Sequence, residues 1–173
     1  MNINASSASS LPIEEKIRYA RELFDRGGET LLREPSVTKL LAILDRNIAA
    51  SQEAMVRFGI VDACRHCEEE EGGSCCGAGI ENRYNPILLL INLLMSRDLP
   101  EKRQWENSCF FLGENGCRLK ARHILCINYL CLRVQKMLPP NDLIALQTIT
   151  GEEMDTIFLL HETVKKILNK NIR

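Results

Sequence analysis

The chain has 173 residues, of which 45% are hydrophobic and 26% are charged, and its formal net charge is −1. This composition is ordinary for a globular protein with one core, and the charge balance lacks the basic excess that nucleic-acid binding requires. Aromatic residues make up only 5% of the chain, which also argues against a surface that stacks bases. We therefore expect one domain and no nucleic acid among its partners.

Residues 1–10 are rich in serine, alanine and asparagine and are predicted to be disordered, with Ser10 as the N-cap of the first helix. The N-terminus has no basic segment followed by an apolar run, so it does not resemble a secretory signal. The most apolar run, residues 86–95, is about half the ~20 residues that a membrane-spanning helix needs. We therefore predict a cytoplasmic protein without a membrane partner, in a compartment that keeps thiols reduced.

Apolar residues at helical spacing predict two helices before the first cysteine. The first is expected to end at Gly27-Gly28, because glycine after the last periodic residue is a helix stop signal. The second is expected to run from Ser36, its N-cap, to Gly59. Their short connection favours an antiparallel helical hairpin over residues 11–59.

Two short motifs predict elements in the middle of the chain. Asn85-Pro86 matches an N-cap followed by the first helical position, and it predicts a buried helix that runs to about Met95. Gly113-Glu-Asn-Gly116 separates two apolar pieces and predicts a tight hairpin, in which Asn-Gly supplies a positive φ.

Residues 136–173 are expected to form the C-terminal helices. Asn141 is a candidate N-cap for a short helix, and Thr150-Gly-Glu-Glu153 fits the capping box of a longer last helix. His161 falls on the apolar stripe of that last helix, which is typical of a core histidine.

The cysteines are the most informative residues of the chain. All eight lie in one segment, residues 60–135, and the flanks contain none. In a reducing compartment, clustered cysteines bind metal or do redox chemistry more often than they form a disulfide framework, and a chain of this length does not need disulfides to fold. We predict that all eight are metal ligands: Cys64, Cys67, Cys75, Cys76, Cys109, Cys117, Cys126 and Cys131.

The first four cysteines bear on how many ions are bound. Cys64 and Cys67 form a Cys-x-x-Cys pair, which lets two thiolates reach one ion from a single turn. Cys75 and Cys76 are adjacent, and neighbouring side chains point in different directions, which suits two ions, a bridge or a cluster with separate metal corners. The acidic residues 68–71 and the two glycines after them are predicted to form a solvated turn between these pairs.

The last pair bears on the kind of metal. Cys126 and Cys131 are predicted to share a helical segment, and five residues of separation place them about 140° apart around an ideal helix. Thiolates around one zinc ion are only roughly 3.7 Å from each other, so this spacing suits a larger iron–sulfur cluster or two separate sites better. We therefore favour an iron–sulfur cluster over zinc and keep both. Imidazole also suits either metal, but we expect His66 and His123 to lie outside the ligand set because eight thiols are available.

Thiolate centres are anionic and need compensating charge, since four thiolates around a divalent ion leave a net charge of about −2. Several arginines lie next to the cysteines in sequence. We predict that some of them bind the cofactor by donating to its sulfur atoms, together with backbone N–H groups of residues 77–79 and 113–116. The alternative is that they only solvate the surface. The candidates are Arg65, Arg118 and Arg122, with Arg133 as a fourth.

In the order of these motifs, the chain resembles the YkgJ-type cysteine-cluster family, described as zinc- or iron-chelating proteins. The matching motifs cover residues 64–131: Cys64-x-x-Cys67, Cys75-Cys76, Cys109-Phe110-Phe111-Leu112, Gly116-Cys117, Arg122 to Cys126, and Cys131. The chain has Arg122-His123 where family members usually have Arg-Pro, and an acidic insertion where their gap before the double cysteine is shorter. The resemblance implies a bound metal centre rather than a defined reaction.

We therefore predict a mainly α protein, a single compact domain over residues 11–173 with helices packed around irregular cysteine-bearing loops, that binds an iron–sulfur cluster or zinc. Its role would be electron transfer, metal handling or structural support of a surface for a protein partner. One alternative is an enzyme that uses the centre for group transfer or redox chemistry. A similar cysteine set occurs in flagellin lysine methylases, although this chain is short for that enzyme and has no S-adenosylmethionine signature. Another alternative is a thiol redox switch, with Cys64/Cys67 or Cys75/Cys76 cycling as disulfides.

Overall fold

A computed structural model describes residues 11–70 and 75–171 of the chain, and this part is mainly helical, as predicted. The predictions for residues 1–10, including the cap at Ser10, and for Gly72-Gly73 lie outside the described residues.

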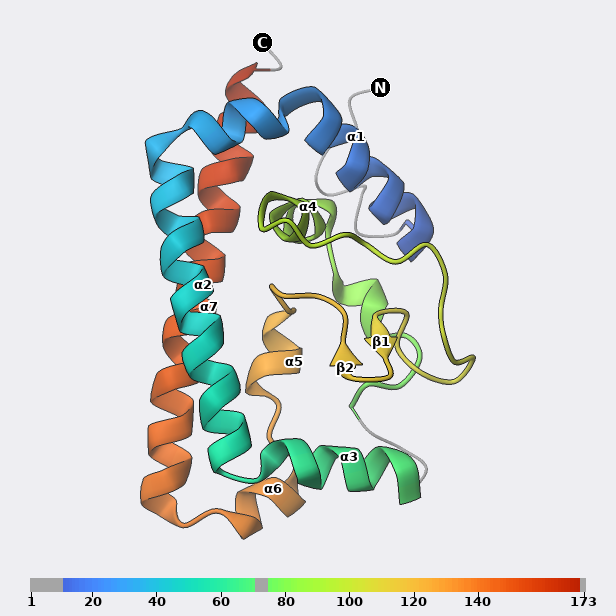
Figure 1. Cartoon of the computed structure of the whole chain (residues 1–173), viewed down its shortest axis with the longest axis vertical. Coiled ribbons are helices and arrows are strands. Elements are labelled where there is room, and N and C mark those ends of the chain that lie inside the picture. The colour runs from blue at the N-terminus through green and yellow to red at the C-terminus, as the bar shows by residue number, and fades with distance from the viewer. Residues whose placement is uncertain (1–10, 71–74, 172–173) are drawn as a thin grey trace.

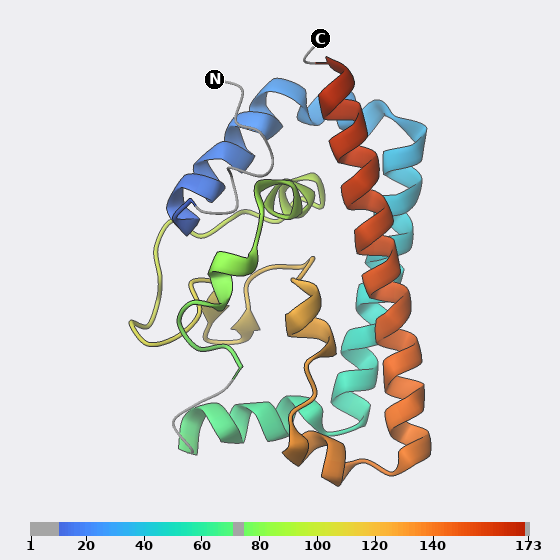
Figure 2. The ribbon, with the colours of Figure 1, turned by 180° about the vertical axis from the view of Figure 1, so that it is seen from behind.

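Two long helices, α2 (Pro35–Arg57) and α7 (Pro140–Asn171), lie side by side and form one wall of the molecule (Figure 1 and Figure 2). The shorter elements that carry the cysteines are gathered on one side of this wall. The remaining elements are α1 (Ile13–Arg33), α3 (Ile60–Glu70), the 3-10 helix η2 (Ile80–Arg83), α4 (Pro86–Leu94), β1 (Leu112–Gly113), β2 (Gly116–Cys117), α5 (Ile124–Asn128) and α6 (Leu132–Met137).

The first helix does not end at Gly27-Gly28, contrary to the sequence prediction, because α1 continues to Arg33. Glycine inside a helix costs only about 1 kcal/mol relative to alanine. Gly28 also lies against the Phe24 ring, where an added Cβ would be 2.9 Å from the ring carbon Cδ2. The break comes instead at Glu34, whose extended backbone (ψ 117°) is the conformation favoured before a proline.

The predicted antiparallel hairpin over residues 11–59 is also not found. α1 packs mainly on α4, whereas α2 packs along α7. In Figure 1, α1 leaves the upper end of α2 at a wide angle and lies over α4. The partner of each helix is therefore set by apolar faces from distant parts of the chain, and the short connection between α1 and α2 does not decide it.

At the C-terminus, α7 is one continuous helix across Thr150-Gly-Glu-Glu153, so the predicted capping box is wrong. The hydroxyl of Thr150 donates to the C=O of Leu146 at 3.0 Å, which is how a threonine inside a helix satisfies its side chain. Asn141 lies in the first turn of this same helix and does not cap a separate short one.

The two short motifs of the middle segment are confirmed. Asn85 caps α4, and its side chain accepts a hydrogen bond from the backbone N–H of Leu88 at 2.9 Å. Gly113 pairs with Gly116 in a small antiparallel hairpin formed by β1 and β2. Gly116 has a φ of +95°, a conformation that glycine adopts without strain.

Two hydrophobic cores lie between these elements. The larger one fills the space between α1, α2, α4 and the C-terminal half of α7, with Ile17, Leu89 and Leu160 among its buried residues. The smaller core lies where α2 ends and where α3, α6 and α7 meet, and it consists of Ala54, Met55, Ile60, Val134, Leu138 and Leu146.

None of the described helices is both long enough and apolar enough to cross a membrane.

Candidate metal centre

All eight cysteines lie within the described residues, and none of them forms a disulfide bond. They come from α3, the loop after it, the turn before β1, β2, α5 and the residue before α6. Backbone contacts, packing and electrostatic coupling divide them into two groups. We call these the α3–α6 group (Cys64, Cys67, Cys75 and Cys131) and the hairpin group (Cys76, Cys109, Cys117 and Cys126).

In the α3–α6 group, Cys64 and Cys67 lie one turn apart on α3 and therefore share a helix face. Cys131 immediately precedes α6, which lies beside the start of α3 in both views (Figure 1 and Figure 2). The pKa of the Cys64 thiol is raised, first by desolvation and then by the sulfurs of Cys131 and Cys67. Desolvation and these same three thiols also raise the pKa of Cys75. Repulsion between thiolates fades with distance, so these sulfurs are neighbours.

In the hairpin group, Cys109 is buried, and its backbone N–H donates to the C=O of Cys76 at 2.6 Å. The pKa of Cys109 is raised to about 11, chiefly by desolvation and further by the thiols of Cys117 and Cys126. Cys117 is exposed as a whole residue, but its sulfur lies against the protein. Desolvation of this sulfur is the largest cause of the raised pKa of Cys117, and the thiol of Cys126 raises it further. Three sulfurs of this group are therefore coupled, and the fourth residue, Cys76, is joined to Cys109 by a backbone hydrogen bond.

The last two cysteines are separated by a break in the predicted helical segment. α5 ends at Asn128, and Tyr129 after it has an extended backbone. Cys131 then takes the cap position of α6. As a result, Cys126 lies with the hairpin and Cys131 with α3.

A buried tyrosine contacts the hairpin group. The hydroxyl of Tyr84 donates toward the Sγ atom of Cys126 at 3.9 Å and accepts the backbone N–H of His123 at 2.9 Å. The Tyr84 ring packs on Phe111, with 4.9 Å between ring centroids. Desolvation, followed by the nearby thiol of Cys117, raises the pKa of Tyr84 well above its ordinary value, so the phenol keeps its proton. Sequence analysis did not single out this residue.

Two of the predicted arginines lie at the hairpin group. The charge of Arg122 lowers the pKa of both Cys117 and Cys126, against the larger effect of desolvation. Arg118 also lowers the pKa of Cys117, and its guanidinium donates to the C=O of Phe110 at 2.8 Å. By contrast, Arg65 and Arg133 are exposed on α3 and α6, as the alternative of surface solvation expects.

Arg122 also faces a buried acid that sequence analysis assigned to a helix cap. The carboxylate of Glu153 on α7 is fully buried, and neither of its oxygens has a hydrogen-bond partner among the described residues. Desolvation raises the pKa of Glu153, while the Ser51 hydroxyl and the charge of Arg122 oppose this shift. Ser51 lies close enough to act on the carboxylate but does not meet hydrogen-bond geometry. Arg122 is therefore the cation shared by Glu153 and the hairpin-group thiols.

Asn92 ties the segment between Cys117 and Cys126 to α4. Its side-chain oxygen accepts the backbone N–H groups of Lys120 at 2.8 Å and Ala121 at 3.0 Å, and its amide donates to the C=O of Ala121 at 2.9 Å. Asn92 is completely buried. The sequence offered one signal for this role, since Asn92 is a single amide in the otherwise apolar run of residues 86–95.

The acidic residues after Cys67 do not form the predicted solvated turn as far as they are described, since Glu68 to Glu70 belong to α3. The carboxylate of Glu68 accepts a hydrogen bond from the Ser108 hydroxyl at 3.2 Å. The backbone C=O of Ser108 accepts from Arg103, which also pairs with the buried carboxylate of Glu81. This network connects α3 to the loop that precedes Cys109.

Both candidate histidines use their Nδ1 atoms within their own helices. His123 accepts the backbone N–H of Leu125 at 3.2 Å and so caps α5, and desolvation, followed by the charge of Arg83, lowers its pKa. The Nδ1 atom of His66 lies 3.9 Å from a carboxylate oxygen of Glu70, one turn along α3. That neither ring is a metal ligand stays a prediction.

The donor set fits a soft metal, because both groups offer only thiols. In the described part of the chain, no three cysteine, histidine, aspartate or glutamate side chains lie close enough together to hold one metal ion as they stand. A single ion would therefore need side-chain movement, whereas a cluster with several metal corners accepts thiolates that lie further apart.

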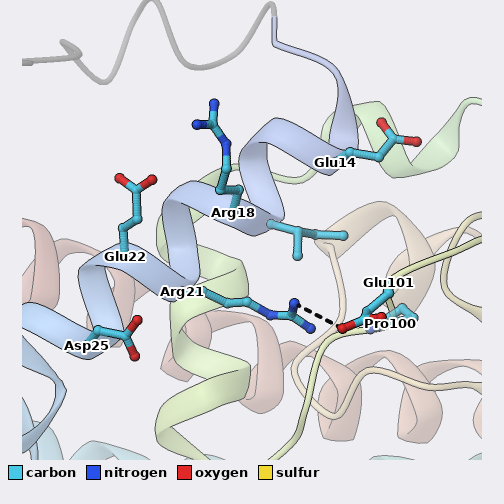
Figure 3. Close-up of a pocket in the computed structure, with 8 residues that line it drawn as sticks. Glu14, Arg18, Arg21, Glu22, Asp25, Pro100 and Glu101 are labelled. Atoms are coloured by element: carbon cyan, nitrogen blue, oxygen red, sulfur yellow. Dashed lines mark ion pairs between the residues drawn. The ribbon is translucent and has the colours of Figure 1, made fainter.

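A surface depression on α1 lies outside both groups of cysteines (Figure 3). It is lined by acidic and basic side chains of α1 and by the loop at Pro100 and Glu101. The Arg21 guanidinium lies 3.7 Å from the Glu101 carboxylate across this depression, while Arg18 and Glu22 point away from it. Charges that already pair with each other, with no thiol among them, do not suit a metal cofactor.

Comparison of the chain with family models, with curated proteins and with solved structures found no match in any of the three. The resemblance to the YkgJ-type family therefore stays a prediction that rests on the cysteine pattern.

Proposed function

We propose that this chain is a cytoplasmic metal protein that holds an iron–sulfur cluster or zinc through its clustered cysteines, and that it serves in electron transfer, metal handling or structural support. The observation that supports the proposal is that thiols far apart in sequence are neighbours in the fold, Cys64 with Cys131 in one group and Cys109 with Cys126 in the other, and that none is in a disulfide bond. Desolvation, followed by repulsion from neighbouring thiols, disfavours the thiolate and raises the pKa of Cys64 and Cys75. A bound cation would stabilise the thiolates and the fold.

We favour an iron–sulfur cluster over zinc on two grounds. The sulfurs of each group couple electrostatically but are not as close as the ligands of one ion, and the corners of a cluster suit such spacing better. The hairpin group also has a hydroxyl donor in Tyr84 and cations in Arg118 and Arg122, the kind of surroundings that set the potential of an iron–sulfur centre. The YkgJ-type resemblance agrees with either metal.

The proposal is tested by purifying the full chain without oxygen and measuring its metal content and visible spectrum. Brown protein with a broad visible band and bound iron supports the iron–sulfur centre, whereas colourless protein with stoichiometric zinc supports the other metal. Protein without metal that takes up and releases two electrons per chain in a reversible thiol titration would instead identify a redox switch.

A further inference from the structure

We infer that the cysteines build two separate four-thiolate metal centres, one from the α3–α6 group and one from the hairpin group, with the adjacent Cys75 and Cys76 serving different centres. The inference rests on the proposed metal-binding function and deepens it, because it assigns the ligands and the number of centres per chain.

The two groups belong to different hydrophobic cores. Cys76, Cys109 and Cys126 pack against the larger core, which includes α4 and the C-terminal half of α7. Cys131 packs against the smaller core, whose residue Ile60 is also the first residue of α3. The residues that surround Cys76, Cys109 and Cys126 are therefore not the residues that surround Cys131.

The adjacent pair divides between these surroundings. The backbone of Cys76 is held against Cys109 by the 2.6 Å hydrogen bond, and the next residue, Gly77, forms a bridge with Ser108. Cys76 is half-buried in this arrangement, whereas Cys75 is exposed and lies near Cys64 and Cys131. Neighbouring residues direct their side chains differently, so one backbone segment supplies a ligand to each group.

The second division falls between Cys126 and Cys131. The chain leaves its helical path after Asn128 and starts a new helix at Leu132. Tyr84 contacts the sulfur of Cys126 from within the larger core. The chain therefore supplies ligands alternately: α3 and Cys75 to one centre, Cys76 to Cys126 to the other, and Cys131 again to the first.

The proximity of the thiols follows the same division. Cys131 lies near enough to interact with both Cys64 and Cys75, whereas Cys126 lies near enough to interact with both Cys109 and Cys117. The two groups also differ in nearby cations, because Arg118 and Arg122 lie near Cys117, whereas no arginine is among the causes that shift Cys64 or Cys75. The exposed Cys64 and Cys75 leave the α3–α6 centre open to solvent. We expect a chelator to remove its metal first.

The test counts metal centres per chain in serine variants of the full-length protein, by elemental analysis and native mass spectrometry without oxygen. Cys64→Ser and Cys117→Ser change exposed residues, one in each group, so packing is disturbed little. Wild type should carry two equal centres, and each variant should keep one, a twofold loss. The double variant of these two should carry none. Circular dichroism on each variant confirms that the helices remain.

The adjacent pair gives the sharper comparison. Cys75→Ser added to Cys64→Ser should cause no further loss, whereas Cys76→Ser added to Cys64→Ser should remove the remaining centre. The pattern should reverse on the background of Cys117→Ser. Loss of all metal in either single variant, or one centre in wild type, would overturn the division into two centres but leave the metal-binding function standing. A wild-type chain without any metal would overturn the function itself.

Discussion

The phenolic oxygen of Tyr84 lies 3.9 Å from the Sγ atom of Cys126, and its second hydrogen bond, from the N–H of His123, leaves its own proton to face the sulfur. Hydrogen bonds to cluster sulfurs raise the reduction potential, because they stabilise the more negative reduced state. In an iron–sulfur protein, Tyr84→Phe should therefore lower the potential. One hydrogen bond of about 1 kcal/mol corresponds to ~40 mV for one electron. A redox titration followed by electron paramagnetic resonance measures the change.

Tyr129→Phe is the matched control, because Tyr129 is 60% exposed and follows α5 on the same segment. Its potential should equal that of wild type. An unchanged potential in Tyr84→Phe, with the cluster intact, would mean that the hydroxyl does not act on the sulfur.

Cys109 should be the slowest cysteine to react in metal-free protein. Its thiol is buried and its pKa is raised to about 11, so roughly 0.1% is thiolate at pH 8, and only the thiolate attacks iodoacetamide. The exposed Cys64 and Cys75 should react first. Peptide mass mapping over time gives the order. Modification of Cys109 as early as Cys64 would contradict its burial.

Glu153 should make the stability of the protein depend on pH. Its carboxyl has a pKa above the usual 4.5, so the folded state holds the proton more tightly than the unfolded state. The resulting stabilisation is fully present below about pH 4.5 and is lost as the pH rises through the folded-state pKa. Glu153→Gln removes this loss, so its free energy of unfolding relative to wild type should rise between acid and neutral pH.

Urea unfolding across this pH range measures the difference, and Glu152→Gln provides the control at the exposed neighbouring position. The control should follow wild type at every pH. If the free energies of unfolding of wild type and Glu153→Gln change with pH in parallel, the Glu153 carboxyl titrates alike in the folded and unfolded states.

Sequence signals predicted those elements whose causes are local. The N-cap at Asn85 and the positive φ at Gly116 each depend on a few neighbouring residues, and both were found. The predicted stop at Gly27-Gly28 failed because packing of α1 on α4 outweighs the small helix cost of glycine. The capping-box pattern at Thr150 is equally compatible with a helix interior, so it could not decide between the two.

For the candidate centre, the residue types could be predicted from the sequence but their partners could not. The adjacent Cys75 and Cys76 already suited two ions, yet which distant thiol joins each of them depends on how α3 and α6 lie in space. Arg118 and Arg122 could be proposed because they neighbour cysteines in sequence. Glu153 could not, since it is brought to Arg122 by the packing of α7 beside α5, which begins just after Arg122.

Asn92→Leu should destabilise the protein by about 3 kcal/mol. The substitution keeps the apolar character of α4 but leaves the buried N–H groups of Lys120 and Ala121 without their acceptor, at about 1–3 kcal/mol for each unsatisfied group. Chemical unfolding measures the loss, with Asn169→Leu on an exposed position of α7 as control. Surface substitutions usually change the free energy of unfolding by less than about 0.5 kcal/mol. A loss no larger than this would mean that water replaces the side chain of Asn92.

Arg122→Gln should make the hairpin group lose its metal at a higher pH than wild type. The Arg122 charge lowers the pKa of Cys117 and Cys126, so without it both thiols take up protons more readily and compete better against the metal. Acid titration followed by the metal–thiolate absorbance gives the midpoint of metal release, which should move upward in pH. Arg65→Gln is the control, because Arg65 is exposed on α3 beside the other group and should leave the hairpin-group midpoint unchanged. Equal shifts in the two variants would reflect net charge alone, and the position of Arg122 between Glu153 and the thiols would then have no part in holding the metal.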